Sequence, residues 1–122
     1  MKNKSFFKRF FGHLRTINHH RHLVMITCFK CGMISQGLKH DLSKYSLTEF
    51  IPSVRYFQGD RSPIGVEKME NGYSKAWLHH KGRNKHHWEY WVDRPSFDVK
   101  IVALEMPFRY MLESVIDRRS NR

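Results

Sequence analysis

Cysteine is scarce in this sequence, with only two among 122 residues. Cys28 and Cys31 lie three positions apart in a stretch whose apolar residues have helical spacing. Such a pair is a poor disulfide framework for a secreted protein and is consistent with a reducing compartment. We therefore expect a cytoplasmic protein in which both thiols lie in the core.

The sequence also lacks a long apolar run. No stretch approaches the roughly 18 apolar residues of a transmembrane helix. Residues 1–11 begin with the positive charge of a secretion signal, but Lys8 and Arg9 interrupt them before an apolar stretch of about 7 residues can form. We expect no transmembrane segment and no secretion. With 40% hydrophobic residues, residues 1–122 should form one domain with a modest core.

Acidic side chains are few. Lys and Arg number 22 against 11 Asp and Glu, which gives a net charge of +11. Such a charge attracts polyanions such as nucleic acid, nucleotides or anionic lipid. Because the basic residues are spread along the whole chain, a solvated basic surface is the alternative interpretation. The sequence has no glycine-rich phosphate loop and no nucleophile elbow, so those two classes of hydrolase are not indicated.

The apolar spacing predicts an all-α protein, a compact helical bundle that could include one small β-hairpin. Residues 5–12 have their four phenylalanines on one helical face, which could pack on the domain or lie on a membrane surface, and we favour packing. A helical period then runs from Leu14 to Gly32 and brings His20 close to the buried face. Residues 33–38 are predicted to form a further short helix.

Shorter elements are predicted next. Ser46 and Glu49 have the spacing of a capping box, and Pro52 should bend or break the helix that they begin. The glycine- and proline-rich residues 58–72 predict a loop with at most one helical turn. Residues 73–80 predict a helix that ends near a glycine.

The last part of the chain combines a weak strand pattern with a helix. Residues 91–102 favour a small hairpin. Pro107 is expected to open the final helix, on which Glu113 and Asp117 share a line beside the apolar face. That apolar face is predicted to consist of Phe108, Met111, Leu112, Val115 and Ile116.

Two dense stretches look like two walls of one site. Residues 40–46 read HDLSKYS, and residues 77–91 read WLHHKGRNKHHWEYW and hold four of the nine histidines. Adjacent side chains on a helix point about 100° apart, so His40 and Asp41 suit a helix end or a metal ion between them. Neutral imidazoles and carboxylates bind divalent metals, and a metal-bound water can ionise near neutral pH and attack a phosphoryl centre. We therefore expect a divalent metal ion as cofactor.

At these residues the chain resembles the HD-domain metal-dependent phosphohydrolases, in which a histidine, a His-Asp pair and a distant aspartate come from different helices. The resemblance implies an HD-like bundle with His20, His40, Asp41 and Asp117 as metal ligands. Lys44 matches the lysine often seen just after the pair. The chain more closely resembles a family of short, uncharacterised bacterial and phage proteins that share both stretches, a likeness that covers most of residues 16–117 and implies no activity.

These observations predict a metal-dependent phosphohydrolase that acts on a nucleotide or another phosphoester. The candidate residues are Asp41 and Lys44 for catalysis; His20, His40, Asp41, His80 and Asp117 for metal; and Lys44, Arg83, Asn84 and His87 for substrate. The four histidines of the second stretch could also add a second metal or bind phosphate; they are His79, His80, His86 and His87.

Two alternatives stay open at this point. Asp117 could be a surface carboxylate that pairs with Arg118 or Arg119. The whole protein could also be a non-enzymatic binder that holds nucleic acid by charge and by aromatic stacking. The stacking side chains would be Trp77, Trp88, Tyr90 and Trp91.

Overall fold

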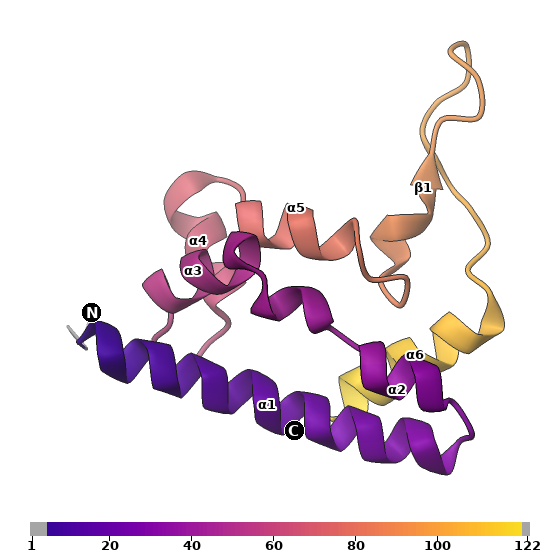
Figure 1. Ribbon diagram of the computed structural model, residues 1–122. Coiled ribbons are helices and arrows are strands. Elements are labelled where there is room, and N and C mark those ends of the chain that lie inside the picture. Colours follow the sequence, from indigo (N-terminus) through magenta and orange to yellow (C-terminus); the bar gives the residue numbers. More distant parts are fainter. Residues whose placement is uncertain (1–4, 121–122) are drawn as a thin grey trace.

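The longest element of the computed structural model, which describes residues 5–120, is helix α1 (Phe6–Lys30) (Figure 1). The helix begins at Ser5, whose hydroxyl accepts a hydrogen bond from the backbone amide three residues later at 3.3 Å. Beyond its end lies Gly32 with φ 79°, a left-handed conformation that glycine adopts without steric cost. The two helical stretches predicted for this region are one continuous helix.

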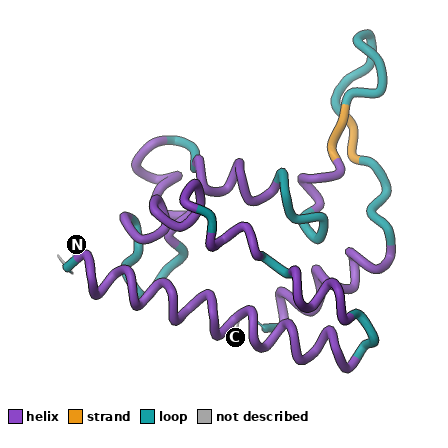
Figure 2. The backbone as a smooth tube through the Cα atoms, in the orientation of Figure 1, coloured by secondary structure: helices purple, strands orange, loops and turns teal. Residues whose placement is uncertain are grey.

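Shorter elements complete the described part of the chain (Figure 2). They are α2 (Ile34–Lys39), the 3₁₀ helix η1 (Leu42–Tyr45), α3 (Leu47–Arg55), α4 (Pro63–Asn71), α5 (Lys75–Lys81), the 3₁₀ helix η2 (Trp88–Trp91), β1 (Val92–Asp93), β2 (Val102–Ala103) and α6 (Phe108–Arg119). The predicted all-α fold with one small hairpin is confirmed. None of the described helices has the length and apolar character needed to cross a membrane.

Two small apolar clusters hold α3 and α6 on α1. Their buried residues are Ile17, Phe50 and Val54 in the α1–α3 cluster, and Val24, Cys28 and Ile116 in the α1–α6 cluster. On α1, His20 lies one turn after Ile17 and one turn before Val24, so it points into the space between the clusters. That space is polar, because the largest fully buried side chains of the described residues are His40 and His86.

The strand pair forms an arm, residues 92–103, that projects from the helical body (Figure 1). Its strands are antiparallel, with Val92 opposite Ala103. Phe97, between the two strands in the sequence, is 87% exposed. The predicted hairpin is therefore present, but it adds nothing to the apolar core.

Residues 58–72 include helix α4, so the prediction of a loop is wrong for most of this segment. Pro63 occupies the first helical position, where its missing N–H has no partner to lose. Gly72 ends the helix with φ 79°. The residues that indicated a loop are thus the start and stop signals of a helix, whose inner face buries Val66.

Predictions about helix α3 fail at two points. Of the predicted bend or break at Pro52, the break is absent, because the helix runs through Pro52 as one element. The capping box does not form, because the Ser46 hydroxyl donates to the carbonyl oxygen of Ser43 at 2.5 Å and makes no cap hydrogen bond. The Glu49 carboxylate is buried and accepts hydrogen bonds from two histidines instead. Its role is therefore in the centre of the molecule.

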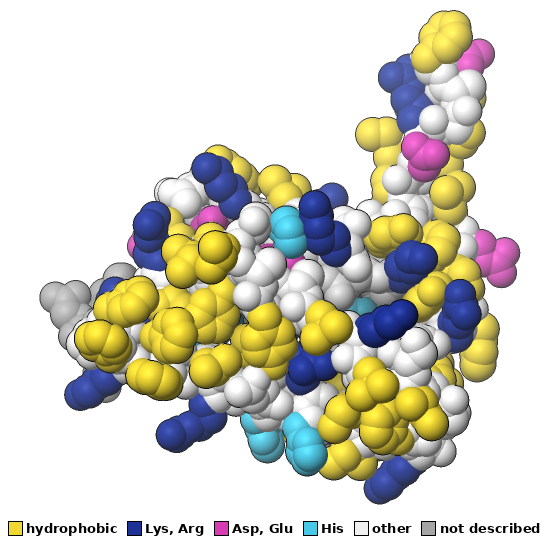
Figure 3. All heavy atoms as spheres, viewed as in Figure 1, with side chains coloured by type: hydrophobic (Ala, Val, Ile, Leu, Met, Phe, Trp, Pro, Cys, Tyr) yellow, Lys and Arg dark blue, Asp and Glu magenta, His cyan; other side chains and the backbone are white. Residues whose placement is uncertain are grey.

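The predicted packing of the first phenylalanines is correct for one of the four. The Phe10 ring packs edge-on against Phe50, with centroids 5.1 Å apart. Phe6, Phe7 and Phe11 are 51%, 71% and 60% exposed. Figure 3 shows hydrophobic side chains gathered over the N-terminal part of α1.

The inner face of α6 differs from the predicted apolar face. Glu113 and Ile116 are buried, and Asp117 is partly buried beside them. Three residues of the predicted face are exposed, namely Phe108, Met111 and Val115. The helix is turned toward its carboxylates because histidines lie opposite them. The prediction of two core thiols is likewise half right, since Cys28 is buried and Cys31 is exposed.

Candidate metal centre

The helical conformation is interrupted between α2 and η1, and this turn places two consecutive side chains inside the molecule. His40 follows the last residue of α2, and Asp41 has φ 54° and ψ 26°, the only positive φ of a non-glycine residue in the part of the chain described. Aspartate tolerates this conformation better than most residues. The Arg21 guanidinium stabilises this turn by donating hydrogen bonds to the carbonyl oxygens of His40 at 2.8 Å and Leu38 at 2.7 Å. As a result, His40 and Asp41 are only 2% and 1% exposed.

Helices α1 and α6 and the turn between α2 and η1 bring a first ligand group together, which consists of His20, His40, Asp41 and Asp117. His20 Nε2 lies 2.6 Å from Asp117 Oδ1, although the two residues are 97 positions apart. His40 Nε2 lies 3.2 Å from the same oxygen and 3.2 Å from Asp41 Oδ2. One ligand atom from each of the four residues lies within 4.8 Å of the others, which is close enough to surround one metal ion.

Asp41 also belongs to a second ligand group, with His80, His86 and His87. Its Oδ1 lies 3.3 Å from His80 Nε2 and 3.2 Å from His86 Nε2. His87 Nε2 lies 2.9 Å from His80 Nε2. Burial and the charges of neighbouring histidines lower the pKa of His87 to about 4, so its ring is neutral at pH 7. Asp41 therefore faces one group with each oxygen, as a carboxylate that bridges two metal ions would.

Carboxylates behind the rings fix how the imidazoles face the centre. Glu113 Oε2 lies 2.7 Å from His40 Nδ1 and 2.9 Å from His86 Nδ1. Glu49 Oε1 lies 2.7 Å from His80 Nδ1. An ionised carboxylate only accepts hydrogen bonds, so in each case Nδ1 carries the proton and donates. The Nε2 atoms then turn toward Asp41, as in the carboxylate–histidine–metal arrangement of metalloproteins.

This arrangement requires positive charge between the rings and Asp41. With neutral rings, each Nε2 lone pair would face a carboxylate oxygen, and two acceptors repel. Asp41 Oδ1 and His86 Nε2 are in fact both buried without a hydrogen-bond partner in residues 5–120. Buried polar atoms without partners are rare and costly. Either a proton or a metal ion must lie at such positions, and the donor set fits a divalent cation.

The pKa values of these residues also indicate that the centre favours positive charge. Burial lowers the pKa of His40, but its hydrogen bonds to three carboxylates outweigh burial and raise it to about 11. Burial lowers the pKa of His86, but its contacts with the Asp41 and Glu113 carboxylates outweigh burial and raise it. Burial raises the pKa of Glu113, whereas hydrogen bonds from His40 and His86 lower it to about 2. A cation bound here would replace protons that the rings otherwise hold tightly.

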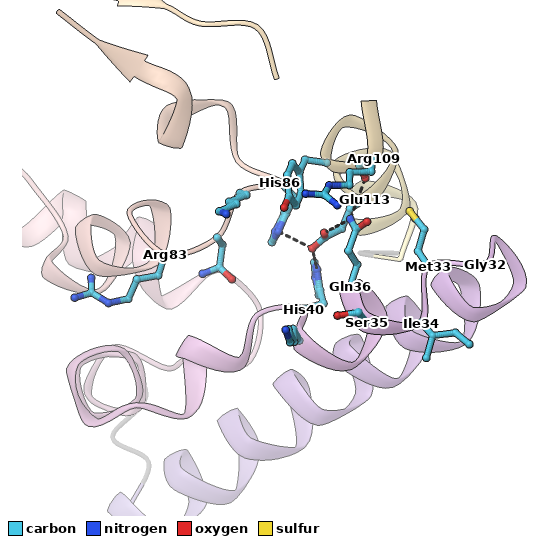
Figure 4. A pocket seen from close by; sticks show the side chains of 14 residues that line it. Gly32, Met33, Ile34, Ser35, Gln36, His40, Arg83, His86, Arg109 and Glu113 are labelled. Carbon is cyan, nitrogen blue, oxygen red and sulfur yellow. Dashed lines mark hydrogen bonds and ion pairs between the residues drawn. The ribbon is translucent and has the colours of Figure 1, made fainter. Parts of the chain in front are cut away.

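Of the residues predicted to bind substrate, Lys44 lies closest to the first group. Its Nζ is 3.2 Å from Asp41 Oδ2, and its side chain is 26% exposed. Asn84 is 7% exposed, and its amide donates to Ser43 Oγ and to the His80 carbonyl oxygen, both at 2.8 Å. The Arg83 side chain points away from the centre (Figure 4). The structure thus gives Asn84 a supporting position and leaves Arg83 at the periphery.

Two carboxylates of the centre were not identified from the sequence as site residues. Glu113 lies one turn before Asp117 on α6, and this spacing is the signal that could have identified it. Glu49 offered no comparable signal, because it was explained as part of a capping box. Among the four histidines of the second stretch, His79 stays outside the ligand groups and donates to Glu49 Oε2 at 2.6 Å.

A basic hollow of about 570 Å³ borders the centre on the side of Glu113 (Figure 4). It lies between α2, α6 and residues 83–86, and His40, His86 and Glu113 form part of its wall. The cations on its lining are Lys39, Arg83, Lys85 and Arg109, so Arg83 lies on this hollow although its side chain points away from the ligand groups. The positive charge of the chain is thus present close to the buried centre.

Fold and site together define an all-α protein built around a buried cluster of histidines and carboxylates that suits divalent metal ions. The chain belongs to a family described as "Family of unknown function (DUF5662)", which it matches over residues 9–121. No curated protein and no solved structure matches the chain.

Proposed function

We propose that this protein is a metal-dependent phosphohydrolase that acts on a nucleotide or another phosphoester. The observation that carries the proposal is the convergence of His20 and Asp117, 97 positions apart, on the consecutive pair His40 and Asp41. Neither local helix propensity nor charge balance requires these four side chains to meet. A shared cation gives a physical reason for this arrangement.

The two ligand groups would hold one metal ion each. The first would use His20, His40, Asp41 and Asp117, and the second Asp41, His80, His86 and His87. When bound, divalent metals lower the pKa of a coordinated water and neutralise charge on phosphoryl oxygens. Glu113 and Glu49 keep the rings oriented by accepting from their Nδ1 atoms.

In this proposal Lys44 would meet the phosphate. Its ammonium group already lies against Asp41, and a phosphoryl group at the centre would carry negative charge within its reach. Lysine acts here as a point charge, which suits charge that develops on phosphoryl oxygens. His40 and Asp41 are buried, and ionic contacts are stronger in such low-dielectric surroundings than in bulk water.

A second candidate function, a non-enzymatic nucleic-acid binder, is favoured by one observation. Trp88 and Tyr90 in η2 are 58% and 37% exposed, and the Lys85 ammonium lies 6.0 Å from the Tyr90 ring centroid. Exposed aromatics among cations are typical of surfaces on which bases stack. Such binding needs no metal, so metal content separates the two candidates.

The first experiment is elemental analysis of protein purified without a histidine tag and dialysed against Mn²⁺, Fe²⁺ or Zn²⁺. We expect more than one metal ion per chain, and we expect Asp41→Ala to lose both because Asp41 belongs to both ligand groups. Asp60→Ala is the matched control, since the Asp60 side chain is 68% exposed and lies outside the centre. Wild-type protein without bound metal would overturn the proposal.

The second experiment measures hydrolysis of p-nitrophenyl phosphate and bis-p-nitrophenyl phosphate by the metal-loaded protein. We expect turnover of at least one ester, lost in Asp41→Ala and kept in Asp60→Ala. A metal-loaded wild type that hydrolyses neither these esters nor a panel of nucleotides would reject hydrolysis. Salt-dependent binding of single-stranded DNA by the same protein would then favour the second candidate.

A further inference from the structure

A second cavity, of about 340 Å³, adjoins the centre on the side opposite the α6 carboxylates. It lies between α1, α3, residues 59–64 and the start of α5. Two of its lining residues also touch the ligand groups: Lys44 contacts Asp41, and Glu49 contacts His80. The cavity is therefore separated from the candidate metal ions by no more than one side chain.

His13 is the polar group of this cavity that the proposed hydrolysis leaves without a role. It is 6% exposed, and its Nδ1 is buried without a hydrogen-bond partner in the described part of the chain. Its ring is held by Phe50 and Phe57, with centroids 5.2 Å and 6.0 Å away. Burial, with the charge of Lys44, lowers its pKa to about 4, so the ring is neutral at pH 7. A neutral imidazole offers one donor and one acceptor.

The rest of the lining restricts the chemistry of an occupant. The apolar wall consists of Ile17, Phe57, Pro63, Ile64 and Ala76. The Glu49 carboxylate is taken by His79 and His80, so it is not a free anion for a cationic ligand. Thr16 already donates to the Gly12 carbonyl oxygen. An occupant thus meets apolar side chains, the polar atoms of His13 and Ser53, and two cations, Lys44 beside Asp41 and the 55% exposed Arg61.

An aromatic heterocycle matches this lining better than other organic groups. Its faces are apolar and can pack on Phe57, and its edge carries acceptors and donors for His13. A polyol would leave many hydroxyls without partners, and an alkyl chain would leave His13 Nδ1 unpaired. The volume lies near the lower end of the roughly 300–1,000 Å³ typical of ligand pockets, which suits one ring system.

We propose that this cavity holds the uncharged heterocycle of the substrate, of nucleobase size, while the phosphate of the same molecule lies at Lys44 beside Asp41. His13 binds the edge of the ring and sets the preference for a heterocyclic ester. The position assigned to the phosphate rests on the proposed function. The position assigned to the heterocycle does not depend on a bound metal.

The test is isothermal titration of metal-free protein with AMP, UMP and ribose 5-phosphate, in the presence of EDTA. We expect at least one nucleotide to bind about tenfold more tightly than ribose 5-phosphate, because only the nucleotides fill the cavity. His13→Phe keeps the ring shape among Phe50 and Phe57 but removes the polar edge, so it should reduce this preference to about twofold or less. Its affinity for ribose 5-phosphate should not change.

Two matched variants sharpen the test. Lys44→Gln should lower the affinities for the nucleotides and for ribose 5-phosphate by the same factor, because it removes only the charge that contacts the phosphate. His22→Phe replaces an exposed histidine on the same helix and should leave all affinities unchanged. As a measurement that needs no variant, the ¹⁵N chemical shift of His13 Nδ1 should move when adenosine or uridine is added.

Equal wild-type affinity for AMP, UMP and ribose 5-phosphate would overturn the ring assignment, as would a His13 signal that moves with neither adenosine nor uridine at saturation. Either result can occur in a protein that binds metal and hydrolyses esters. Conversely, a protein without metal or hydrolysis could still prefer nucleotides through His13. Failure of the ring assignment and failure of the proposed hydrolysis are therefore distinguishable.

Discussion

The α1–α3 cluster and the candidate metal centre lie one turn apart on α1, yet they hold the molecule together in different ways. Ile17 is 3% exposed and packs against apolar side chains, an interaction that needs no partner from solution. His20 contacts the Asp117 carboxylate in a centre where acceptors face acceptors. The comparison teaches that burial alone stabilises the first region, whereas the second is complete only with positive charge supplied to it.

Metal removal should have the largest effect on this comparison. Binding to the folded state alone stabilises a protein by about 4 kcal/mol when the free ligand exceeds its Kd a thousandfold. We expect EDTA to remove stabilisation of this order from the metal-loaded wild type, measured by urea unfolding. The centre of Asp41→Ala lacks the shared ligand, so EDTA should leave the stability of this variant unchanged. A wild type whose unfolding ignores EDTA would contradict the comparison.

A cavity created in the α1–α3 cluster should lower the free energy of unfolding by nearly as much as metal removal, through loss of apolar packing. Ile17→Ala removes buried methylene and methyl groups and should lower the free energy of unfolding by about 3 kcal/mol. This loss should be the same with and without metal. Leu47→Ala, at a residue that is 76% exposed, is the control and should change stability by no more than about 0.5 kcal/mol.

Glu113→Gln tests the carboxylate behind the rings. The amide oxygen can still accept one hydrogen bond, but the charge that fixes two Nδ1 protons is lost. We expect metal affinity to fall by about 10- to 100-fold, measured by competition with a chelating dye. Glu105→Gln, at an exposed residue outside the centre, should leave it unchanged. An unchanged affinity in Glu113→Gln would show that ring orientation does not depend on Glu113.

The smallest effect is expected from His13, in the apolar surroundings of α1 and α3. Its folded pKa of about 4 lies below the unfolded value of 6.5, so the unfolded chain binds the proton more readily. The stability that neutral His13 contributes is present above pH 6.5 and is lost as the pH falls toward 4. At pH 5.5 the loss should be about 1 kcal/mol relative to pH 7.5. His13→Phe should lack this component in urea unfolding at the two pH values.

Local signals predicted the elements better than their faces. Helical spacing identified α1, and the dense stretches identified most histidines of the centre. The inner face of α6 could not be predicted from hydropathy, because Glu113 and Asp117 are turned inward by histidines far away in the sequence. Start and stop signals in residues 58–72 were mistaken for a loop, since proline and glycine mark both.

Long-range pairing was predicted only through the resemblance to HD-domain proteins. That resemblance named His20 and Asp117 together, and their side chains do meet. Whether they hold a metal ion stays a prediction. Glu49 was missed because a short-range explanation was available for it. His13 was missed because nothing in the sequence distinguishes it from the other three histidines of α1 or indicates a cavity beside it.

The arm is the part of the chain that connects the histidines of residues 80–87 to the α6 carboxylates. The chain passes through residues 92–103 before it reaches α6, so the peptide link between Asp117 and the histidines runs through an exposed loop. A protease that cut after Arg94 or Lys100 would leave two pieces. The α6 piece would then be held by the α1–α6 cluster and by its carboxylates. A cation shared by His20 and Asp117 would become a cross-link between the two pieces and would decide whether the nicked protein stays whole.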